Sequence, residues 1–411
     1  MKNSNNMNIC IIGQGYVGLP IAIESAKAGN TVFGFDIDFK KIEGLKNGSS
    51  LLPEPTKLEI ESLQDQGKLI FISDLRQATN IEIYVIAVPT PLDDLKEPDL
   101  SFLKNACKSI ASNLQDNTLI INESTSYIGT LRNLISPMIE SQSNAKNLKF
   151  AIAPERIDPG NTSWSVKNTP RIVSGLSETA IFEAVAFYSQ FCDQVIRVEK
   201  PEVAEAAKLI ENTFRQVNIA LVNELSEISN KYGFLLSDAV TAAATKPFGF
   251  MPFYPSLGAG GHCIPVDPSY LKYSAKLVGL DSKLIDIANS VNNSRPAKVV
   301  EMIENQLNFS FYRKTVQIVG IAYKSGTSDV RESPALEFIN VLRQKGANVI
   351  YHDPFVSSYQ DLASEELRAD IDLGIIITPT DKIDFRKWKD SNLLVLDLSV
   401  NSKFTNWIKF F

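Results

Sequence analysis

The stretch Asn8-Ile9-Cys10-Ile11-Ile12-Gly13-Gln14-Gly15-Tyr16-Val17-Gly18 joins an apolar run to a turn that contains three glycines. A helical pattern follows over Ile21–Ala28, and a second apolar run, Thr31–Phe35, ends at Asp36. Strand, glycine turn, helix, strand and acid in this order are typical of a dinucleotide-binding unit. The glycines allow a tight turn and the close approach of a pyrophosphate, and the helix N-terminus offers N–H groups to the phosphates.

The acid at the end of the second strand indicates which dinucleotide is bound. Asp36 follows Gly18 at close to the spacing of an acid that accepts a hydrogen bond from a ribose hydroxyl. A carboxylate there would repel a 2′-phosphate, so we predict NAD rather than NADP as the cofactor. The residues predicted to bind it from this unit are Gly13, Gly15, Tyr16, Val17, Gly18 and Asp36.

Length and composition limit the remaining possibilities. At 411 residues the chain is too long for one ordinary core, so we expect two or three domains. Its apolar fraction of 44% and charged fraction of 21% are typical of a globular protein that is soluble. The net charge of -6 argues against nucleic acid or a membrane surface as a partner. No apolar run reaches the roughly 20 residues that span a bilayer, and the polar start of the sequence does not resemble a signal peptide.

Cysteine and histidine usage predicts neither disulfides nor a metal site. The chain has two histidines, and its four cysteines, Cys10, Cys107, Cys192 and Cys263, show no paired spacing. We therefore expect reduced thiols, a cytoplasmic location and no bound metal.

Alternating strand and helix patterns continue after the first unit and predict a doubly wound parallel sheet. The predicted strands are Leu69–Ile72, Ile83–Val88, Thr118–Asn122 and Phe150–Ala153, with Arg171–Ser174 and Val195–Val198 as closing strands. Ligands of open α/β sheets bind beyond the carboxyl ends of the strands. Three residues follow such ends, and we expect Thr90 and Thr125 to line the nicotinamide side of a cleft and Glu155 to be a candidate acid. The alternatives are that the threonines are turn residues and that Glu155 is an ordinary loop carboxylate.

A single long helix is predicted from Glu202 to Tyr232, a stretch that contains neither glycine nor proline after Pro201. Such a helix would be about 45 Å long, long enough to bridge two domains and to offer a surface to a partner subunit. Lys208 and Asn212 are four residues apart and share one face of it. Taken alone, this lysine is more simply interpreted as a solvated charge.

One cysteine stands apart in Gly258-Ala259-Gly260-Gly261-His262-Cys263-Ile264-Pro265-Val266-Asp267-Pro268. Gly260 and Gly261 have no side chains, so a ligand can come close to the backbone. A thiol on such a loop can be reached, whereas most lone cysteines are small buried hydrophobes. We predict that Cys263 is a covalent nucleophile.

The second half of the chain repeats the α/β pattern without the glycine motif. A helical region, Pro268–Leu307, precedes predicted strands at Thr315–Val319, Asn348–His352, Leu373–Thr378 and Leu393–Leu396, with a helix over Ser333–Lys345. The predicted fold class is therefore α/β, with two Rossmann-like doubly wound domains joined by a long central helix and a helical region. The predicted domains are 1–200, 201–307 and 308–411.

These motifs together resemble the UDP-glucose/GDP-mannose dehydrogenase family. The resemblance covers almost the whole chain. It rests on the Gly13–Gly18 turn, Val88-Pro89-Thr90-Pro91, Ala153-Pro154-Glu155-Arg156, Lys208 with Asn212, the cysteine loop, and Tyr323-Lys324 with Ser328-Asp329-Val330-Arg331-Glu332-Ser333-Pro334.

The resemblance implies an NAD-dependent, four-electron oxidation of the C6 alcohol of a nucleotide sugar to a carboxylate. Cys263 would attack the intermediate aldehyde, and the thioester formed by a second hydride transfer would be hydrolysed. Lys208 and Asn212 would stabilise the oxyanion, Glu155 would act as acid and base, and Asp267 and Thr125 would position water.

The resemblance also implies ligand-binding residues and a partner. The nucleotide sugar would be held by Glu155, Arg156, Lys208, Asn212, Tyr254, Gly258, Gly260, Tyr323 and Lys324. Lys41 would lie near the adenosine ribose, and Arg331 would reach toward NAD. The partner implied is a second copy of the chain, forming a homodimer through the long helix.

Two segments, Glu155–Asn161 and Thr245–Pro255, resemble the branch that oxidises UDP-N-acetylglucosamine, for the synthesis of surface polysaccharide precursors. UDP-N-acetylmannosamine and UDP-glucose remain alternative substrates, and a two-electron hydroxyacid dehydrogenase is an alternative activity. Pro255-Ser256-Leu257-Gly258 departs from the usual Pro-Gly-Pro-Gly of the family. Ser256 would have to tolerate backbone angles of glycine, or the loop would differ locally.

Overall fold

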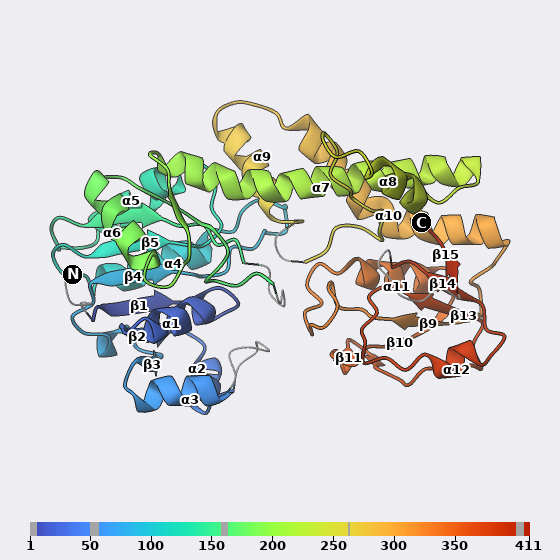
Figure 1. Cartoon of the computed structure of the whole chain (residues 1–411), viewed down its shortest axis with the longest axis horizontal. Helices are drawn as coiled ribbons and strands as arrows, with labels where there is room; N and C mark the ends of the chain where they lie inside the picture. Colours follow the sequence, from blue (N-terminus) through green and yellow to red (C-terminus); the bar gives the residue numbers. More distant parts are fainter. Residues whose placement is uncertain (1–5, 50–56, 158–162, 262–263, 400–406) are drawn as a thin grey trace. The chain divides into compact units, whose positions relative to one another are not determined.

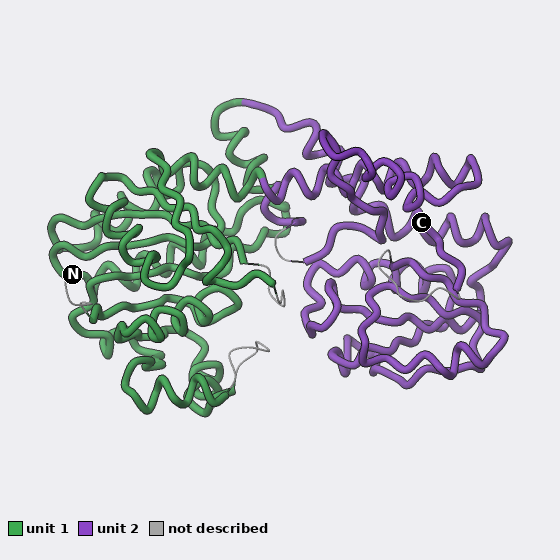
Figure 2. The backbone as a smooth tube through the Cα atoms, viewed as in Figure 1, with its two compact units in different colours: residues 1–210, 269–279 green, residues 211–268, 280–411 purple. Residues whose placement is uncertain are grey.

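The computed structural model describes residues 6–49, 57–157, 163–261, 264–399 and 407–411. The chain divides into two compact units (Figure 2). Unit 1 comprises residues 1–210 and 269–279, and unit 2 comprises residues 211–268 and 280–411. Residues 201–307, for which the sequence predicts a central helical domain, contribute to both units.

Unit 1 is built on an eight-stranded sheet with the order β3-β2-β1-β4-β5-β6-β7-β8. Its strands are β1 (Asn8–Ile12), β2 (Thr31–Phe35), β3 (Leu69–Ile72), β4 (Ile83–Ile86), β5 (Leu119–Asn122), β6 (Lys149–Ile152), β7 (Arg171–Gly175) and β8 (Val195–Arg197). The first six are parallel, as the alternating pattern predicts. The sheet departs from the predicted parallel arrangement at one place, because β7, predicted as a closing strand, runs antiparallel to β6. No helix joins these two strands in the described residues, and an antiparallel neighbour needs no crossover helix.

Helices cover both faces of this sheet (Figure 1). Alternate residues of a strand point to opposite faces, so Ile9 and Ile11 of β1 belong to one buried cluster, and Cys10 and Ile12 to the other. The first cluster includes side chains from α1 (Gly18–Lys27), α2 (Phe39–Lys46), α3 (Lys57–Asp65) and α6 (Glu178–Tyr188). The second includes side chains from α4 (Ser101–Ala111), the π turn η2 (Leu131–Ile135) and α5 (Ser136–Glu140). This is the doubly wound arrangement predicted from the sequence.

Unit 2 contains a second, smaller sheet with the order β10-β9-β13-β14-β15. Its strands are β9 (Thr315–Val319), β10 (Asn348–His352), β13 (Leu373–Ile376), β14 (Val395–Asp397) and β15 (Ile408–Lys409), all parallel to their neighbours. One face is covered by α11 (Pro334–Gln344) and by part of α10 (Lys283–Leu307), and the other by α12 (Arg386–Lys389) with Trp388. Strand β15 and the hairpin β11 (Ser358–Tyr359) with β12 (Leu362–Ala363) are too short to leave a pattern in the sequence.

The predicted long helix is confirmed as α7 (Pro201–Tyr232), which has 32 residues. The helical region predicted after the cysteine loop consists of α9 (Asp267–Leu277) and α10, and Gly279 lies between them with a positive φ of 76°. A further helix, α8 (Leu236–Ala243), follows α7. In the described parts of the chain, no helix is both long and apolar enough to cross a membrane.

Candidate active site

The glycine turn after β1 has a different steric reason at each of its glycines. Gly13 has a φ of 96°, and a Cβ there would lie 2.4 Å from the carbonyl oxygen of Ala87. A Cβ at Gly18 would lie 1.9 Å from the carbonyl oxygen of Gly13. A Cβ at Gly15 would meet no described atom within 4 Å. The outer two glycines are therefore required by the fold, whereas Gly15 leaves open space of the kind that a pyrophosphate needs.

Asp36 places its carboxylate beside this turn. Its Oδ2 accepts from the backbone N–H of Gln14 at 2.9 Å and lies 2.7 Å from Nζ of Lys41. Its Oδ1 accepts from the N–H of Asp38 at 3.0 Å. Asp36 and Lys41, which were both predicted to lie near the adenosine ribose, are thus direct neighbours. A carboxylate held at the end of β2 beside a glycine turn fits a ribose diol.

The carboxyl ends of three adjacent strands carry the other predicted polar residues of unit 1. The hydroxyl of Ser124, after β5, accepts from the N–H of Val88 at 2.9 Å and joins the turn after β4 to the turn after β5. The N–H of Glu155, after β6, donates to the carbonyl of Glu123 at 3.3 Å. Parallel strands end at the same edge, so Thr90, Thr125 and Glu155 follow neighbouring strands there, and all three are buried.

Lys208 contributes a cation to Glu155. The Nζ of Lys208 lies 3.3 Å from Oε2 of Glu155, and the N–H of Ile157 donates to Oε1 of the same carboxylate. Lys208 is only 5% exposed, which rules out the solvated-charge interpretation. Removal of either side chain would take an ionic contact away from a buried charge. One guanidinium nitrogen of Arg156 donates to the carbonyl of Pro170 at 2.8 Å.

Asn212, one turn further along α7, contacts Asp267 in unit 2. Its Nδ2 donates to Oδ2 of Asp267 at 2.6 Å, and Asp267 is 1% exposed at the start of α9. The residue predicted as the nucleophile, Cys263, lies outside the described residues. The other three cysteines are buried, and burial raises the pKa of each thiol, to about 12 for Cys107.

The glycines predicted to bind the nucleotide sugar pack closely against other parts of unit 2. A Cβ at Gly258 would lie 3.1 Å from the carbonyl oxygen of Asn292. A Cβ at Gly260 would lie 2.8 Å from Cδ of Pro334 and 3.4 Å from Cβ of Tyr323. The segment that contains Gly258 and Gly260 therefore lies against Tyr323, another predicted substrate residue.

The remaining predicted residues of unit 2 have mixed surroundings. Tyr254 is partly buried against the apolar cluster formed by Val222, Leu236 and Val240. Arg331 is exposed and pairs with Asp329 at 2.6 Å, and Lys324 directly follows Tyr323 in the loop after β9. Ser256 does not have a positive φ, so the loop in this chain does not require the backbone angles of glycine at that position.

A buried ion pair between Glu123 and Arg171, close to the segment that carries Glu155, was not predicted from the sequence. Glu123, at 0% exposure, accepts from Arg171 at 2.6 Å and from the hydroxyl of Tyr188, and Arg171 also donates to the carbonyl of Ala153 at 3.4 Å. Burial raises the pKa of Glu123, which Arg171 opposes. The only signal in the sequence is the position of Glu123 at the end of a predicted strand. The pair supports the backbone on both sides of Pro154 and so the segment that carries Glu155.

A second unpredicted acid, Glu205, lies one turn before Lys208 on α7. Its carboxylate accepts from the N–H groups of Gly129 and Leu131, the latter at 2.9 Å, and so connects α7 to the loop that follows Thr125. Burial raises the pKa of Glu205 to about 7. Glu205 is three residues before Lys208, so both side chains lie on one face of the helix. This spacing is the feature of the sequence that could have indicated Glu205.

A glycine turn that fits a dinucleotide, a ribose-type acid and a buried carboxylate–lysine pair at the same sheet edge define an oxidoreductase of the dinucleotide-binding class. The chain belongs to the UDP-glucose/GDP-mannose dehydrogenase family. It matches the NAD binding domain of that family over residues 7–192, the central domain over 202–294 and the UDP binding domain over 317–400. It is accordingly a nucleotide-sugar dehydrogenase, and NAD is its cofactor.

Two curated relatives and one solved structure illustrate the similarity. The chain is 33% identical to a UDP-N-acetyl-D-mannosamine dehydrogenase of Pyrococcus horikoshii, over 92% of this chain and 90% of the relative. It is 34% identical to a UDP-N-acetyl-D-glucosamine 6-dehydrogenase of Pseudomonas aeruginosa, over 86% and 84%. The solved structure of the UDP-N-acetylmannosamine enzyme from Pyrococcus horikoshii covers 98% of both chains with a TM-score of 0.88 at 30% identity. Relatives of nearly equal identity thus have two different substrates.

Proposed function

We propose that this enzyme oxidises the C6 alcohol of a UDP-N-acetylhexosamine, UDP-N-acetylglucosamine in particular, to the uronic acid for the synthesis of surface polysaccharide precursors. Both kinds of relative named above act on UDP-N-acetylhexosamines. The segments Glu155–Asn161 and Thr245–Pro255 favour the glucosamine epimer, because they resemble that branch of the family.

The single observation that carries the proposed chemistry is the buried pair of Glu155 and Lys208. An ammonium fixed in a site with little water stabilises an oxyanion as it forms on the sugar. The carboxylate beside it takes up or returns a proton at the water that enters the hydrolysis. The pair thus supplies the two groups that such a reaction needs.

The second oxidation requires a covalent intermediate, and we assign it to Cys263. NAD, when bound, accepts a hydride in each of the two oxidations. The thiolate of Cys263 adds to the aldehyde carbon to form a thiohemiacetal, and loss of hydride from that carbon leaves a thioester. Water then cleaves the carbon–sulfur bond, which releases the carboxylate and regenerates the thiol. Asn212 and Asp267, paired at 2.6 Å, would bind the oxyanion and the water.

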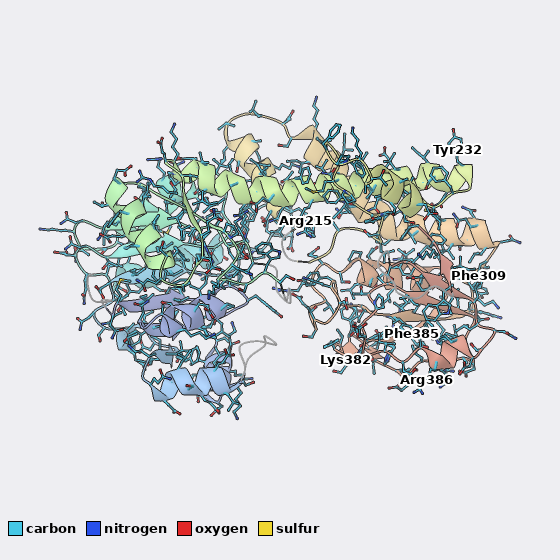
Figure 3. The ribbon with its side chains drawn as sticks, viewed as in Figure 1. Arg215, Tyr232, Phe309, Lys382, Phe385 and Arg386 are labelled. Atoms are coloured by element: carbon cyan, nitrogen blue, oxygen red, sulfur yellow. The ribbon has the colours of Figure 1, made fainter. Side chains whose placement is uncertain are left out.

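We also propose that the enzyme is a homodimer formed through α7. Several large apolar side chains of this helix are exposed in unit 2 and recur at steps of three, four or seven residues: Phe214, Leu221, Leu225, Ile228 and Tyr232. Tyr232, labelled near the end of the helix in Figure 3, is 80% exposed. An apolar stripe of this kind on a long helix is typical of an interface between subunits. Light scattering should give the mass of a dimer for the parent and of a monomer for Leu221→Glu. Lys387→Glu, at an exposed lysine of α12, should remain a dimer.

A substrate panel tests the proposed specificity. The enzyme is incubated with NAD and, separately, with UDP-N-acetylglucosamine, UDP-N-acetylmannosamine, UDP-N-acetylgalactosamine and UDP-glucose, and the acid product is identified by mass spectrometry. The highest kcat/KM is expected with UDP-N-acetylglucosamine. A preference for UDP-N-acetylmannosamine would contradict the choice of epimer, and a carbonyl product without acid would favour a two-electron dehydrogenase.

A further inference from the structure

Ser256 is held by three sets of hydrogen bonds within unit 2. Its N–H donates to Oδ1 of Asn223 at 2.8 Å, and its carbonyl accepts from Nε of Arg295 at 3.2 Å. Its hydroxyl donates to the carbonyl of Gly258 at 3.0 Å and accepts from the N–H of Gly258 at 3.3 Å. Side chains from two helices, α7 and α10, therefore hold both backbone polar groups of Ser256, and its own hydroxyl closes a turn onto Gly258.

Arg295 is fully buried beneath this loop, with 0% of its surface exposed. Besides the carbonyl of Ser256, its guanidinium donates to the hydroxyl of Ser226 and lies 3.5 Å from Oε1 of Glu227. Burial lowers the pKa of Arg295 to about 10, so the group still carries its charge at neutral pH. A buried cation needs several such partners to offset the loss of its water. These contacts fix the position of the guanidinium.

Phe411 covers the guanidinium from a distant part of the sequence. The guanidinium carbon of Arg295 lies 5.0 Å from the centre of the Phe411 ring, which is within the range of a cation–π contact. Phe411 is 5% exposed, and its carbonyl accepts from the hydroxyl of Ser237 at 2.7 Å. The segment that follows β15 is thereby connected to the same group that holds Ser256.

The backbone after Ser256 packs against a carbonyl of α10 to which Pro296 cannot donate a hydrogen bond. Pro296 lies inside this helix and has no N–H, so it cannot donate to the carbonyl of Asn292. That carbonyl is the atom that a Cβ at Gly258 would approach at 3.1 Å. Gly258 has a φ of 140°, and Leu257 between it and Ser256 is buried in the core of unit 2. The loop is therefore anchored at Ser256 and can pack closely only through its glycines.

We infer that Arg295, covered by Phe411, is a positioning residue for nucleotide-sugar binding and acts through the carbonyl of Ser256. It fixes residues 255–261, which we name the substrate loop, in the conformation that places Gly258 and Gly260 against Asn292 and Tyr323. This inference rests on the proposed function, which assigns the substrate loop to the nucleotide sugar. Ser256 is the residue by which this chain departs from the Pro-Gly-Pro-Gly of its family, and its hydroxyl then stabilises the turn that it forms.

Two measurements on the full chain test the inference. Hydrogen exchange of peptides that cover the substrate loop reports its conformation, and calorimetric titration with UDP and with NADH reports binding. In Arg295→Met, which keeps the length of the side chain, the loop should exchange about tenfold faster and UDP should bind about tenfold more weakly, as for loss of one buried hydrogen-bond partner. NADH affinity should stay within about twofold, because the glycine turn and Asp36 are in unit 1. Arg386→Met, at an exposed arginine of the same unit (Figure 3), is the matched control and should change neither.

Two further variants keep the test decisive. Arg295→Lys retains a donor and should recover part of the UDP affinity. Ser256→Ala removes only the hydroxyl, and it should weaken UDP binding by about threefold even if Arg295→Met does not fold. Parental loop exchange and UDP affinity in a folded Arg295→Met would overturn the inference, and parental affinity in Ser256→Ala would overturn the role given to its hydroxyl. If the parent binds no UDP, the proposed function fails, while loop exchange still decides whether Arg295 fixes the loop.

Discussion

The Nζ of Lys208 lies 3.3 Å from Oε2 of Glu155, and both side chains are buried, although they come from a helix and from the end of a strand 53 residues apart in the sequence. Glu155 follows β6 of the NAD-binding sheet, and Lys208 lies in the second turn of α7. Each side chain thus has the opposite charge of the other within reach. In the proposed reaction, the ammonium of Lys208 would stabilise the developing oxyanion and the carboxylate of Glu155 would exchange a proton.

Lys208→Ala should lower kcat by about 10²-fold or more, since it removes one donor to the oxyanion. The control is Lys231→Ala, at an exposed lysine in the last turn of the same helix, which should keep parental activity. Steady-state assays of NADH formation measure both. Near-normal turnover by Lys208→Ala would remove Lys208 from the chemistry and leave it a structural partner of Glu155.

The four cysteines should differ sharply in their reactivity toward iodoacetamide in the folded protein. Cys10, Cys107 and Cys192 are buried and have raised pKa values. They therefore remain protonated, and a protonated thiol reacts slowly because the thiolate is the nucleophile. Mass spectrometry after brief alkylation should therefore find the label on Cys263 first. In a separate experiment with NAD and the nucleotide sugar, Cys263→Ser should bind both ligands without releasing free acid. Labelling of Cys107 ahead of Cys263, or acid release by the variant at the parental rate, would contradict the assignment.

Substitutions at two glycines of the turn should affect folding and cofactor binding separately. Gly18→Ala places a Cβ 1.9 Å from a backbone oxygen and should destabilise unit 1 by several kcal/mol or prevent folding. Gly15→Ala meets no described atom within 4 Å, so its Tm should stay within about 2 °C of the parent while the KM for NAD rises about tenfold or more. Thermal melts and NAD titrations test the pair. A Gly15→Ala enzyme with the parental KM for NAD would place the pyrophosphate elsewhere.

Glu205 should make the stability of unit 1 depend on pH. Burial raises its pKa in the folded protein from 4.5 to about 7, so between these values the folded state binds the proton more tightly than the unfolded state. This contribution is fully present below pH 4.5 and is lost as the pH rises through about 7, with a size of up to about 3 kcal/mol. Glu205→Gln should therefore lose less stability than the parent between pH 5 and pH 8.

Denaturant unfolding at several pH values measures this difference. Glu202→Gln, one turn earlier on α7, is the control. Hydrogen bonding to Arg132 lowers the pKa of Glu202 below 4.5, so its contribution to stability is lost only at more acidic pH, and this variant should keep the parental dependence between pH 5 and pH 8. An identical pH dependence in the parent and in Glu205→Gln would show that the carboxyl group does not titrate in this range.

Much of this architecture could be predicted because it depends on local pattern. Strand β1, the glycine turn and Asp36 are close in sequence, and α7 is a long uninterrupted helix. The antiparallel strand β7 could not be predicted, since its direction depends on how the chain returns after β6. Glu155 and Lys208 could be named as candidates, but the contact between them depends on how α7 packs against the sheet.

The buried residues that support the site were missed for a related reason. Arg171, Glu205 and Arg295 are charged residues in strands or helices, which in a sequence indicate an exposed surface. Only tertiary packing shows that Arg171 meets Glu123 and that Arg295 meets Ser256. The polar interior of this enzyme, rather than its apolar core, is the part that a linear pattern does not reveal.

The most direct test of the central claim is the stoichiometry of the reaction. Purified enzyme is given a limiting amount of UDP-N-acetylglucosamine with excess NAD, and NADH is measured at completion together with the acid. Two NADH for each nucleotide sugar consumed, with all of the sugar recovered as the uronic acid, is the predicted result. One NADH for each sugar, with an aldehyde or ketone as the product, would contradict it.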